Sequence, residues 1–219
     1  MKLASMDISA TASASSIVFD ALRKAIIQGQ LEEGEPLRQD EIARLFNTSR
    51  IPVREAISRL EEQGLVKTRR YKGAVVAALS PKETEEIFNL RALLEPEIIR
   101  NAIPRMTPAL LEEAREKCTA FSSSQDPMAW GDLNRDFHET LYNASDLTFF
   151  KEIVHNAIDR VERQIRAQLV LSNGMKRAGR EHDEIIDACA AGDADRAADL
   201  TRRHIDGAKV SLLKHLKEA

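Results

Sequence analysis

Hydrophobic residues in the first 80 positions follow two different periods. Intervals of three and four, which place hydrophobic residues on one face of a helix, recur over three segments: 16–28, 39–46 and 50–63. Two short runs flank a basic turn and predict a β-hairpin: 65–68 and 74–77 around Arg70–Gly73. Gly29 and Gly64 follow the first and third helical segments, where glycine favours termination. The sequence therefore predicts three short helices and a hairpin.

The spacing also predicts which side chains face the core. In the segment 39–46 we expect Ile42, Leu45 and Phe46 on the inward face. The expected inward residues of 50–63 have the same spacing: Val53, Ala56, Ile57 and Leu60.

From Ser80 onward every segment has helix signals. Ser80 and Glu83 have the spacing of a capping box, and Pro81 suits the first helical position. Six segments carry helical patterns: 81–103, 107–124, 126–144, 147–171, 176–191 and from 193 to the C-terminus. No strand pattern interrupts them, so this part is expected to be an all-α bundle of six or seven helices.

These patterns predict a mainly α protein in three parts. Two short helices joined by a tight turn and followed by a hairpin are typical of a winged helix-turn-helix. We expect a flexible arm over 1–14, the winged helix-turn-helix over 15–79 and the all-α domain over 80–219.

A winged helix-turn-helix places the start of its second helix in the major groove of DNA. The residues expected there are Thr48, Ser49, Arg50 and Arg54. The helix N-terminus attracts phosphate, and each arginine can pair with guanine or with a phosphate. The alternative is that these arginines are only a soluble surface.

Charge is unevenly distributed along the chain. The whole protein has a net charge of −3, which argues against nucleic acid. Residues 44–72, however, hold eight basic and three acidic side chains. This local excess favours a surface that faces a polyanion.

Composition excludes several other classes. Cys118 and Cys189 lack the spacing of a disulfide framework or a zinc finger and fit a reducing cytosol. No apolar run approaches the roughly 18 residues of a membrane span, and the N-terminal segment lacks the apolar core of a signal peptide. A cytoplasmic protein without a membrane partner is expected.

The stretch LRQDEIARLFNTSRIPVREAISRLEEQGLVKTRRYKGAVV resembles the DNA-binding domain of the GntR family of bacterial transcriptional regulators. The likeness covers about residues 17–78 and includes the SRIPVREA core and Gly73 in the wing. It implies that Arg38, Arg50 and Arg54 contact operator DNA and that Gly73 approaches the DNA backbone.

Residues 83–213 resemble the FCD ligand-binding domain of the FadR subfamily of GntR regulators, from EIFNLRALLEPEI to the segments around His138, His182 and His204. The resemblance implies that these histidines and a carboxylate four residues before the first of them hold a divalent metal. Here that position is Asn134, whose amide oxygen can face the same way as His138.

Three neutral imidazoles and an amide leave the +2 charge of such an ion uncompensated, so an anionic effector or hydroxide could supply it. Imidazole ligands favour zinc or nickel. The alternative is a polar pocket that holds no metal.

Arg91 lies in an otherwise apolar helical pattern. It could simply pair with Glu95 one turn later. The FCD resemblance implies instead that it points into the pocket and binds a carboxylate effector.

These observations predict a DNA-binding repressor that acts as a homodimer on a palindromic operator and responds to a small organic acid. Two alternatives are an all-α metalloenzyme, in which the histidines activate water, and an architectural DNA binder that senses nothing.

Overall fold

The computed structural model describes residues 13–127, 129–171 and 174–218. Most of the predicted arm, residues 1–12, lies outside them. The chain divides into two compact units, Met1–Ala78 and Leu79–Ala219, each with hydrophobic core residues of its own. The described residues of both units are mainly helical, and the first unit also contains one hairpin. The predicted mainly α class is therefore confirmed.

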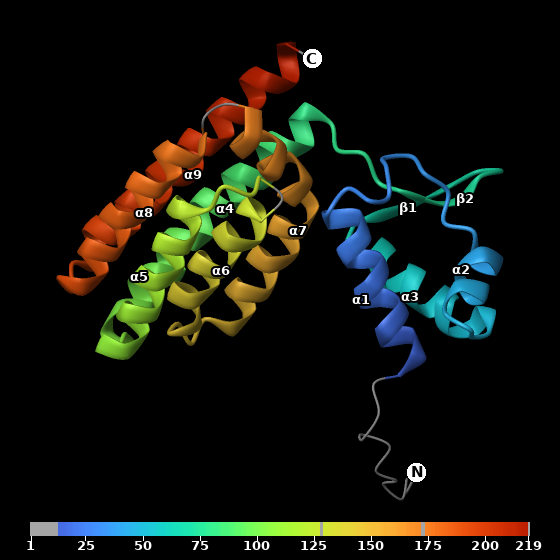
Figure 1. Cartoon of the computed structure of the whole chain (residues 1–219), viewed down its shortest axis with the longest axis horizontal. Helices are drawn as coiled ribbons and strands as arrows, with labels where there is room; N and C mark the ends of the chain where they lie inside the picture. The colour runs from blue at the N-terminus through green and yellow to red at the C-terminus, as the bar shows by residue number, and fades with distance from the viewer. Residues whose placement is uncertain (1–12, 128, 172–173, 219) are drawn as a thin grey trace, which may run out of the picture. The chain divides into compact units, whose positions relative to one another are not determined.

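The first unit contains three helices and a two-stranded antiparallel sheet (Figure 1). Its elements are α1 (Ala14–Ile27), α2 (Gln39–Leu45), α3 (Arg50–Glu62), β1 (Val66–Arg69) and β2 (Gly73–Val76). In the sheet Val66 lies opposite Val76, and Arg69 lies opposite Gly73 next to the turn. The core combines one face of each helix with the inner side of the hairpin, as the hydrophobic spacing predicts.

The buried face of α2 differs from the prediction at one residue. Leu45 is 80% exposed, whereas Ile42 and Ala43 are buried and Phe46 is half-buried against the core. Because successive helical residues are about 100° apart, a face centred between Ile42 and Ala43 lies about 10° from Phe46 and about 110° from Leu45. The prediction was therefore wrong for Leu45.

The second unit is a bundle of six α-helices and one short 3-10 helix among the described residues. Its elements are α4 (Pro81–Ala102), η1 (Ile103–Arg105), α5 (Pro108–Ser123), α6 (Trp130–Asn143), α7 (Thr148–Leu171), α8 (Gly174–Ala190) and α9 (Ala194–Glu218). α4 begins with the predicted capping box, in which Ser80 Oγ accepts from the backbone N–H of Glu83 and Glu83 accepts from that of Ser80.

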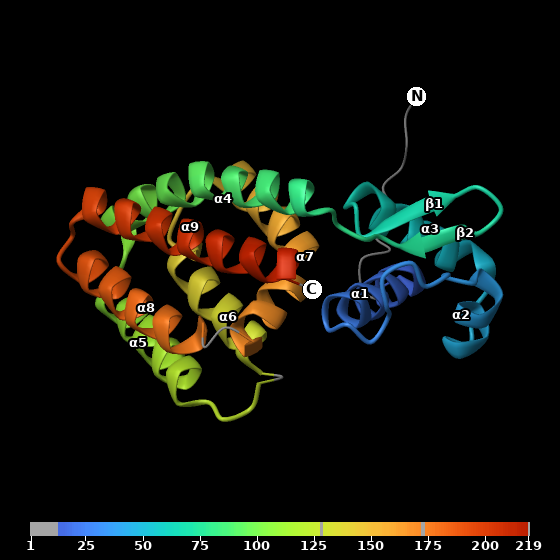
Figure 2. The ribbon, with the colours of Figure 1, turned by 90° about the horizontal axis from the view of Figure 1, so that it is seen from above.

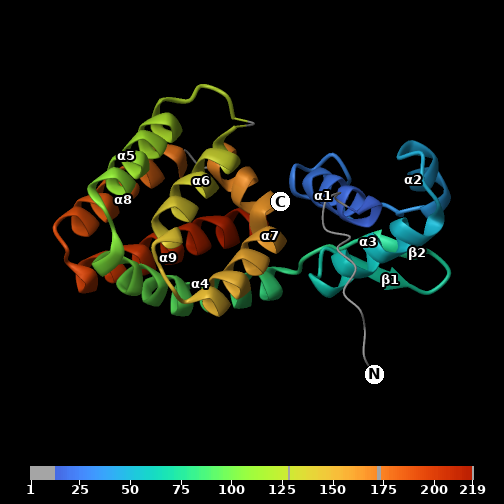
Figure 3. The ribbon, with the colours of Figure 1, turned by 90° about the horizontal axis from the view of Figure 1, so that it is seen from below.

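The six helices pack as a closed ring. α4 packs along α9, followed around the ring by α8, α5, α6 and α7, and α7 returns to α4. Figure 2 shows α4 and α9 side by side, and Figure 3 shows the opposite side with α5, α6 and α7. Neighbours in this ring are often distant in sequence, so the ring interior brings together side chains from α4, α6, α8 and α9.

Candidate functional site

Three histidines meet inside the second unit. His138 lies on α6, His182 on α8 and His204 on α9, and each is buried. One ring nitrogen from each can be chosen so that all three lie within 4.8 Å of one another. Their ring centroids are separated by 4.9–5.1 Å, so the three imidazoles form a nearly regular triangle.

Two of these histidines hold nitrogen atoms without hydrogen-bond partners among the described residues. They are Nε2 of His138 and both ring nitrogens of His182. Burial, reinforced by the charge of His204, lowers the pKa of His138 and of His182 well below the ordinary value. Neutral imidazoles with free lone pairs result, and this is the form that binds a metal.

The third histidine is oriented by a carboxylate. Nδ1 of His204 lies 2.7 Å from Oε2 of Glu181, whose other oxygen is 3.4 Å from Nε of Arg177. A carboxylate on one ring nitrogen fixes the tautomer and directs the other nitrogen towards a ligand. The donor set therefore fits a divalent ion that prefers imidazole, such as zinc or nickel.

Asn134 lies on α6 one turn before His138. It lines two adjoining cavities, the larger with His138 and the smaller with His204. The predicted set of Asn134, His138, His182 and His204 thus comes from three helices that surround one region.

The larger cavity has a volume of about 320 Å³ and lies between α4, α6 and α7. Arg91, His138 and Tyr142 line its buried part, and Val154, Ile158 and Ile165 give it an apolar wall on α7. Half-buried Glu139 and three exposed residues form its rim: Asn143, Glu152 and His155. This volume and lining suit a small molecule that is partly polar.

Arg91 pairs within its own helix and also lines the cavity. Its Nε donates to Oε1 of Glu95 at 2.6 Å, and it also lines the cavity. The hydroxyl of Tyr142 donates to Oε2 of Glu95 at 2.6 Å and lies 3.5 Å from Nδ1 of His138. Glu95 therefore accepts hydrogen bonds from both Arg91 and Tyr142, beside His138.

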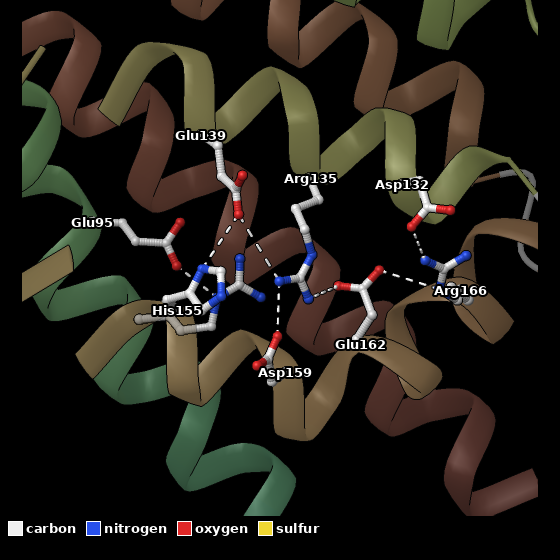
Figure 4. Close-up of polar contacts among 9 residues, drawn as sticks. Glu95, Asp132, Arg135, Glu139, His155, Asp159, Glu162 and Arg166 are labelled. Carbon is white, nitrogen blue, oxygen red and sulfur yellow. Dashed lines mark hydrogen bonds and ion pairs between the residues drawn. The ribbon is translucent and has the colours of Figure 1, made fainter. Parts of the chain in front are cut away.

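A buried charge cluster between α6 and α7 was not predicted (Figure 4). Nη1 of Arg135 lies 2.8 Å from Oδ1 of Asp159, and its Nη2 lies 2.9 Å from Oε2 of Glu162. Arg166 contacts Glu162 at 3.3 Å and Asp132 at 2.5 Å. Asp159 and Glu162 are three residues apart, a spacing that in sequence resembles an ordinary solvated helix face.

In the first unit, four of the residues predicted to contact DNA lie at or next to the start of α3: Thr48, Ser49, Arg50 and Arg54; Arg38 is the N-cap of α2. Ser49 is the N-cap, and its side chain makes no cap hydrogen bond. Arg50 and Arg54 project from one face of α3 and are exposed. Arg50 pairs with Asp40, and Arg38 pairs with Glu41 at 2.9 Å, in both cases at the surface.

The wing tip carries a second exposed group. Tyr71 is 91% exposed and has a left-handed backbone, with φ of 65°. Cζ of Arg70 lies 4.9 Å from the Tyr71 ring centroid. Gly73 has φ of 70°, and a Cβ atom there would meet nothing within 4 Å, so backbone conformation, not crowding, favours glycine.

Known protein families match both units. The family model described as bacterial regulatory proteins, gntR family, matches residues 14–76, and the FCD domain model matches 86–207. None of the helices in the described part of the chain is long and apolar enough to cross a membrane.

Individual relatives agree with these matches. A regulator from Agrobacterium vitis, an uncharacterized HTH-type protein of a ttuE-ttuC' intergenic region, is 36% identical over 58% of this chain and 77% of its own. The gluconate operon transcriptional repressor of Bacillus subtilis is 31% identical over 62% of this chain and 56% of its own.

Solved structures share the fold. E. coli McbR/YncC superposes with a TM-score of 0.82 at 19% identity, over 94% of this chain and all of that one. A GntR family regulator from Pseudomonas syringae reaches a TM-score of 0.57 at 30% identity, over 93% of this chain and 86% of its own.

Proposed function

The chain belongs to the GntR family of bacterial transcriptional regulators and carries an FCD domain, and from this premise we propose that a metal-assisted carboxylate effector controls its binding to operator DNA. The family places the chain among DNA-binding regulators and not among enzymes. Some relatives are named repressors, and we propose repression here.

The observation that carries the proposal is the buried histidine triangle with its unpartnered nitrogens beside a small cavity. We propose that His138, His182 and His204 hold zinc or nickel, with the amide oxygen of Asn134 as a further ligand. Such a cation would act as a Lewis acid that attracts an anionic oxygen of the effector.

Charge explains why the effector would be a carboxylate. Three imidazoles and one amide contribute no negative charge to a divalent cation, so a carboxylate gains more from binding beside the ion than a neutral molecule does. Arg91 lines the same cavity and can donate further hydrogen bonds to the carboxylate.

The link to DNA would pass through α4. This helix carries Arg91 and Glu95 and begins at Pro81, directly after the boundary between the units. An effector that binds better to one position of α4 shifts the equilibrium towards that position. We further propose a homodimer on a palindromic operator, because one winged helix reads few base pairs and two together give the required specificity.

Operator affinity tests this proposal. Fluorescence anisotropy at fixed salt would be measured for full-length protein with zinc, nickel or no metal, each crossed with a panel of small carboxylates. We expect at least one carboxylate to change operator affinity when metal is present, and to do so much less in the His182→Ala variant. Unchanged affinity under every condition would leave a DNA binder that senses nothing.

A further inference from the structure

The cavity has a cationic and an acidic side. Arg91 and the divalent ion that the histidine triangle is proposed to hold form the first side. The second is the charge cluster of α6 and α7, where two arginines face four carboxylates: Arg135 and Arg166 with Asp132, Glu139, Asp159 and Glu162. Among them, Arg135, Glu139 and Glu162 line the cavity directly. The acidic side therefore has more negative than positive charge.

The cationic side chains on the cavity wall are already engaged. Arg91 is bound to Glu95, and Arg135 to Asp159 and Glu162. Lys151 donates to the backbone carbonyl of Ser145 at 2.7 Å. A ligand with two negative groups would find no further cation available for its second group, because protein acceptors already bind the other cations. That second group would instead face the surplus carboxylates.

A buried acceptor on the acidic side lacks a hydrogen-bond donor. Oε1 of Glu162, in a side chain that is 2% exposed, accepts no hydrogen bond from the described residues. Nε of Arg166 lies 3.3 Å away, outside hydrogen-bond geometry. A buried carboxylate oxygen is strongly stabilised by a donor, and a cationic donor would also reduce the charge imbalance.

We propose that the effector is a small zwitterion, a carboxylate that also carries an ammonium group. Its carboxylate binds beside Arg91 and the histidines, and its ammonium group binds at the acidic side formed by Glu139 and Glu162. Liquid water occupies about 30 Å³ per molecule, so the cavity of 320 Å³ accepts a ligand of about ten non-hydrogen atoms. The apolar wall of Val154, Ile158 and Ile165 suits a short carbon chain between the two charges. This inference rests on the proposed carboxylate sensing.

Four probes of matched length separate the possibilities: pentanoate, glutarate, 5-hydroxypentanoate and 5-aminopentanoate. Binding to the full-length, nickel-loaded protein would be measured by isothermal titration calorimetry. We expect 5-aminopentanoate to bind about tenfold more tightly than pentanoate, a typical effect of one favourable charge pair in a partly buried site, and glutarate to bind most weakly. Equal binding of the hydroxy and amino compounds, or tighter binding of glutarate, would overturn the inference.

A variant locates the ammonium site. Glu139 is partly exposed, so Glu139→Gln removes one charge without opening the core. It should abolish the preference for 5-aminopentanoate over pentanoate, whereas Glu116→Gln, on the exposed surface of α5, should leave that preference unchanged. A preference that survives in Glu139→Gln contradicts the inference.

If none of the four probes binds, the proposed carboxylate sensing itself fails. If pentanoate binds and amino selectivity is absent, only the zwitterion is excluded.

Discussion

Arginine ion pairs differ in burial between the two units. In the first unit Arg50 pairs with Asp40 at the surface, where their side chains are 69% and 57% exposed. In the second, Arg135 pairs with Asp159 and Glu162, whose side chains are only 1% and 2% exposed. Exposed pairs contribute at most about 1 kcal/mol, so DNA phosphates can replace the carboxylate at little cost. Removing one partner of a buried pair leaves an uncompensated charge and is strongly unfavourable. An ion pair alone therefore does not reveal whether an arginine is available to bind a ligand. The burial of its carboxylate partner reveals it, because an exposed partner is replaced at little cost and a buried one is not.

Arg135→Ala should give the largest effect. It leaves Asp159 and Glu162 buried with less positive charge around them, and we expect the unfolding free energy to fall by about 3–5 kcal/mol. Urea unfolding would measure the change. Arg203→Ala breaks an exposed pair with Asp199 on α9 and is the control, with an expected loss of at most about 1 kcal/mol. Similar losses for the two variants would remove the distinction between buried and exposed pairs.

Metal removal comes next in size. Ligand that binds only the folded state stabilises it by about 2.7 kcal/mol at a concentration one hundred times the dissociation constant. A chelator should therefore lower the melting temperature of the metal-loaded protein. The His182→Ala variant should show no response to metal or to chelator. A shift of equal size in this variant would place the metal elsewhere.

The metal-free protein should also lose stability in mild acid. Burial lowers the folded-state pKa of His138 and His182, so below the unfolded-state pKa of about 6.5 the unfolded chain binds more protons than the folded one. For each histidine, the unfolding free energy should then decrease by up to about 1.4 kcal/mol for every unit by which the pH is lowered. The stability that these two neutral histidines contribute is present above about pH 6.5 and is lost progressively as the pH falls below that value.

Denaturant unfolding between pH 7.5 and 5 would measure this slope. Replacing His182 by Phe, which preserves stacking on Phe137, should remove about one proton from the slope. An unchanged slope in His182→Phe would contradict the assignment.

Arg54→Ala tests the exposed side of the comparison. If Arg54 reads a base, operator binding should weaken by about 1–3 kcal/mol while binding to random DNA changes little. Anisotropy titrations on both duplexes at one salt concentration would measure this. Equal losses on both would assign Arg54 to a phosphate.

Asp40→Asn should have the smallest effect. It frees Arg50 from an exposed pair, so stability should change by less than about 1 kcal/mol, and binding to DNA should strengthen slightly because Arg50 no longer exchanges partners. A large loss of stability would show that this surface pair behaves like the buried ones.

Local periodicity predicted much of the fold and little of the acidic side of the cavity. Hydrophobic spacing placed the helices close to their observed bounds because each amphipathic face is encoded over a few residues. It failed at Leu45, where a seven-residue helix offers too few positions to centre the buried face. The partners Arg135 and Glu162 lie on different helices, and no local pattern distinguishes such a pair from two solvated charges.

The histidine triangle needed more than spacing. His138, His182 and His204 are separated by tens of residues, and only the resemblance to the FCD domain linked them. Neither source of information predicted that Glu181 orients His204, because the distance between these side chains depends on how α8 and α9 pack.

The closed ring of helices has a consequence for how the protein is made. α4, the first helix of the second unit, packs most extensively against α9, and α9 supplies the last histidine of the triangle. The first unit has its own core and is complete at Ala78. At synthesis rates of about 5–20 residues per second, His204 follows Ala78 by roughly 6–25 s. During that interval the nascent chain can carry a folded DNA-binding unit before the histidine triangle can form, and the proposed effector could not yet influence its contact with DNA.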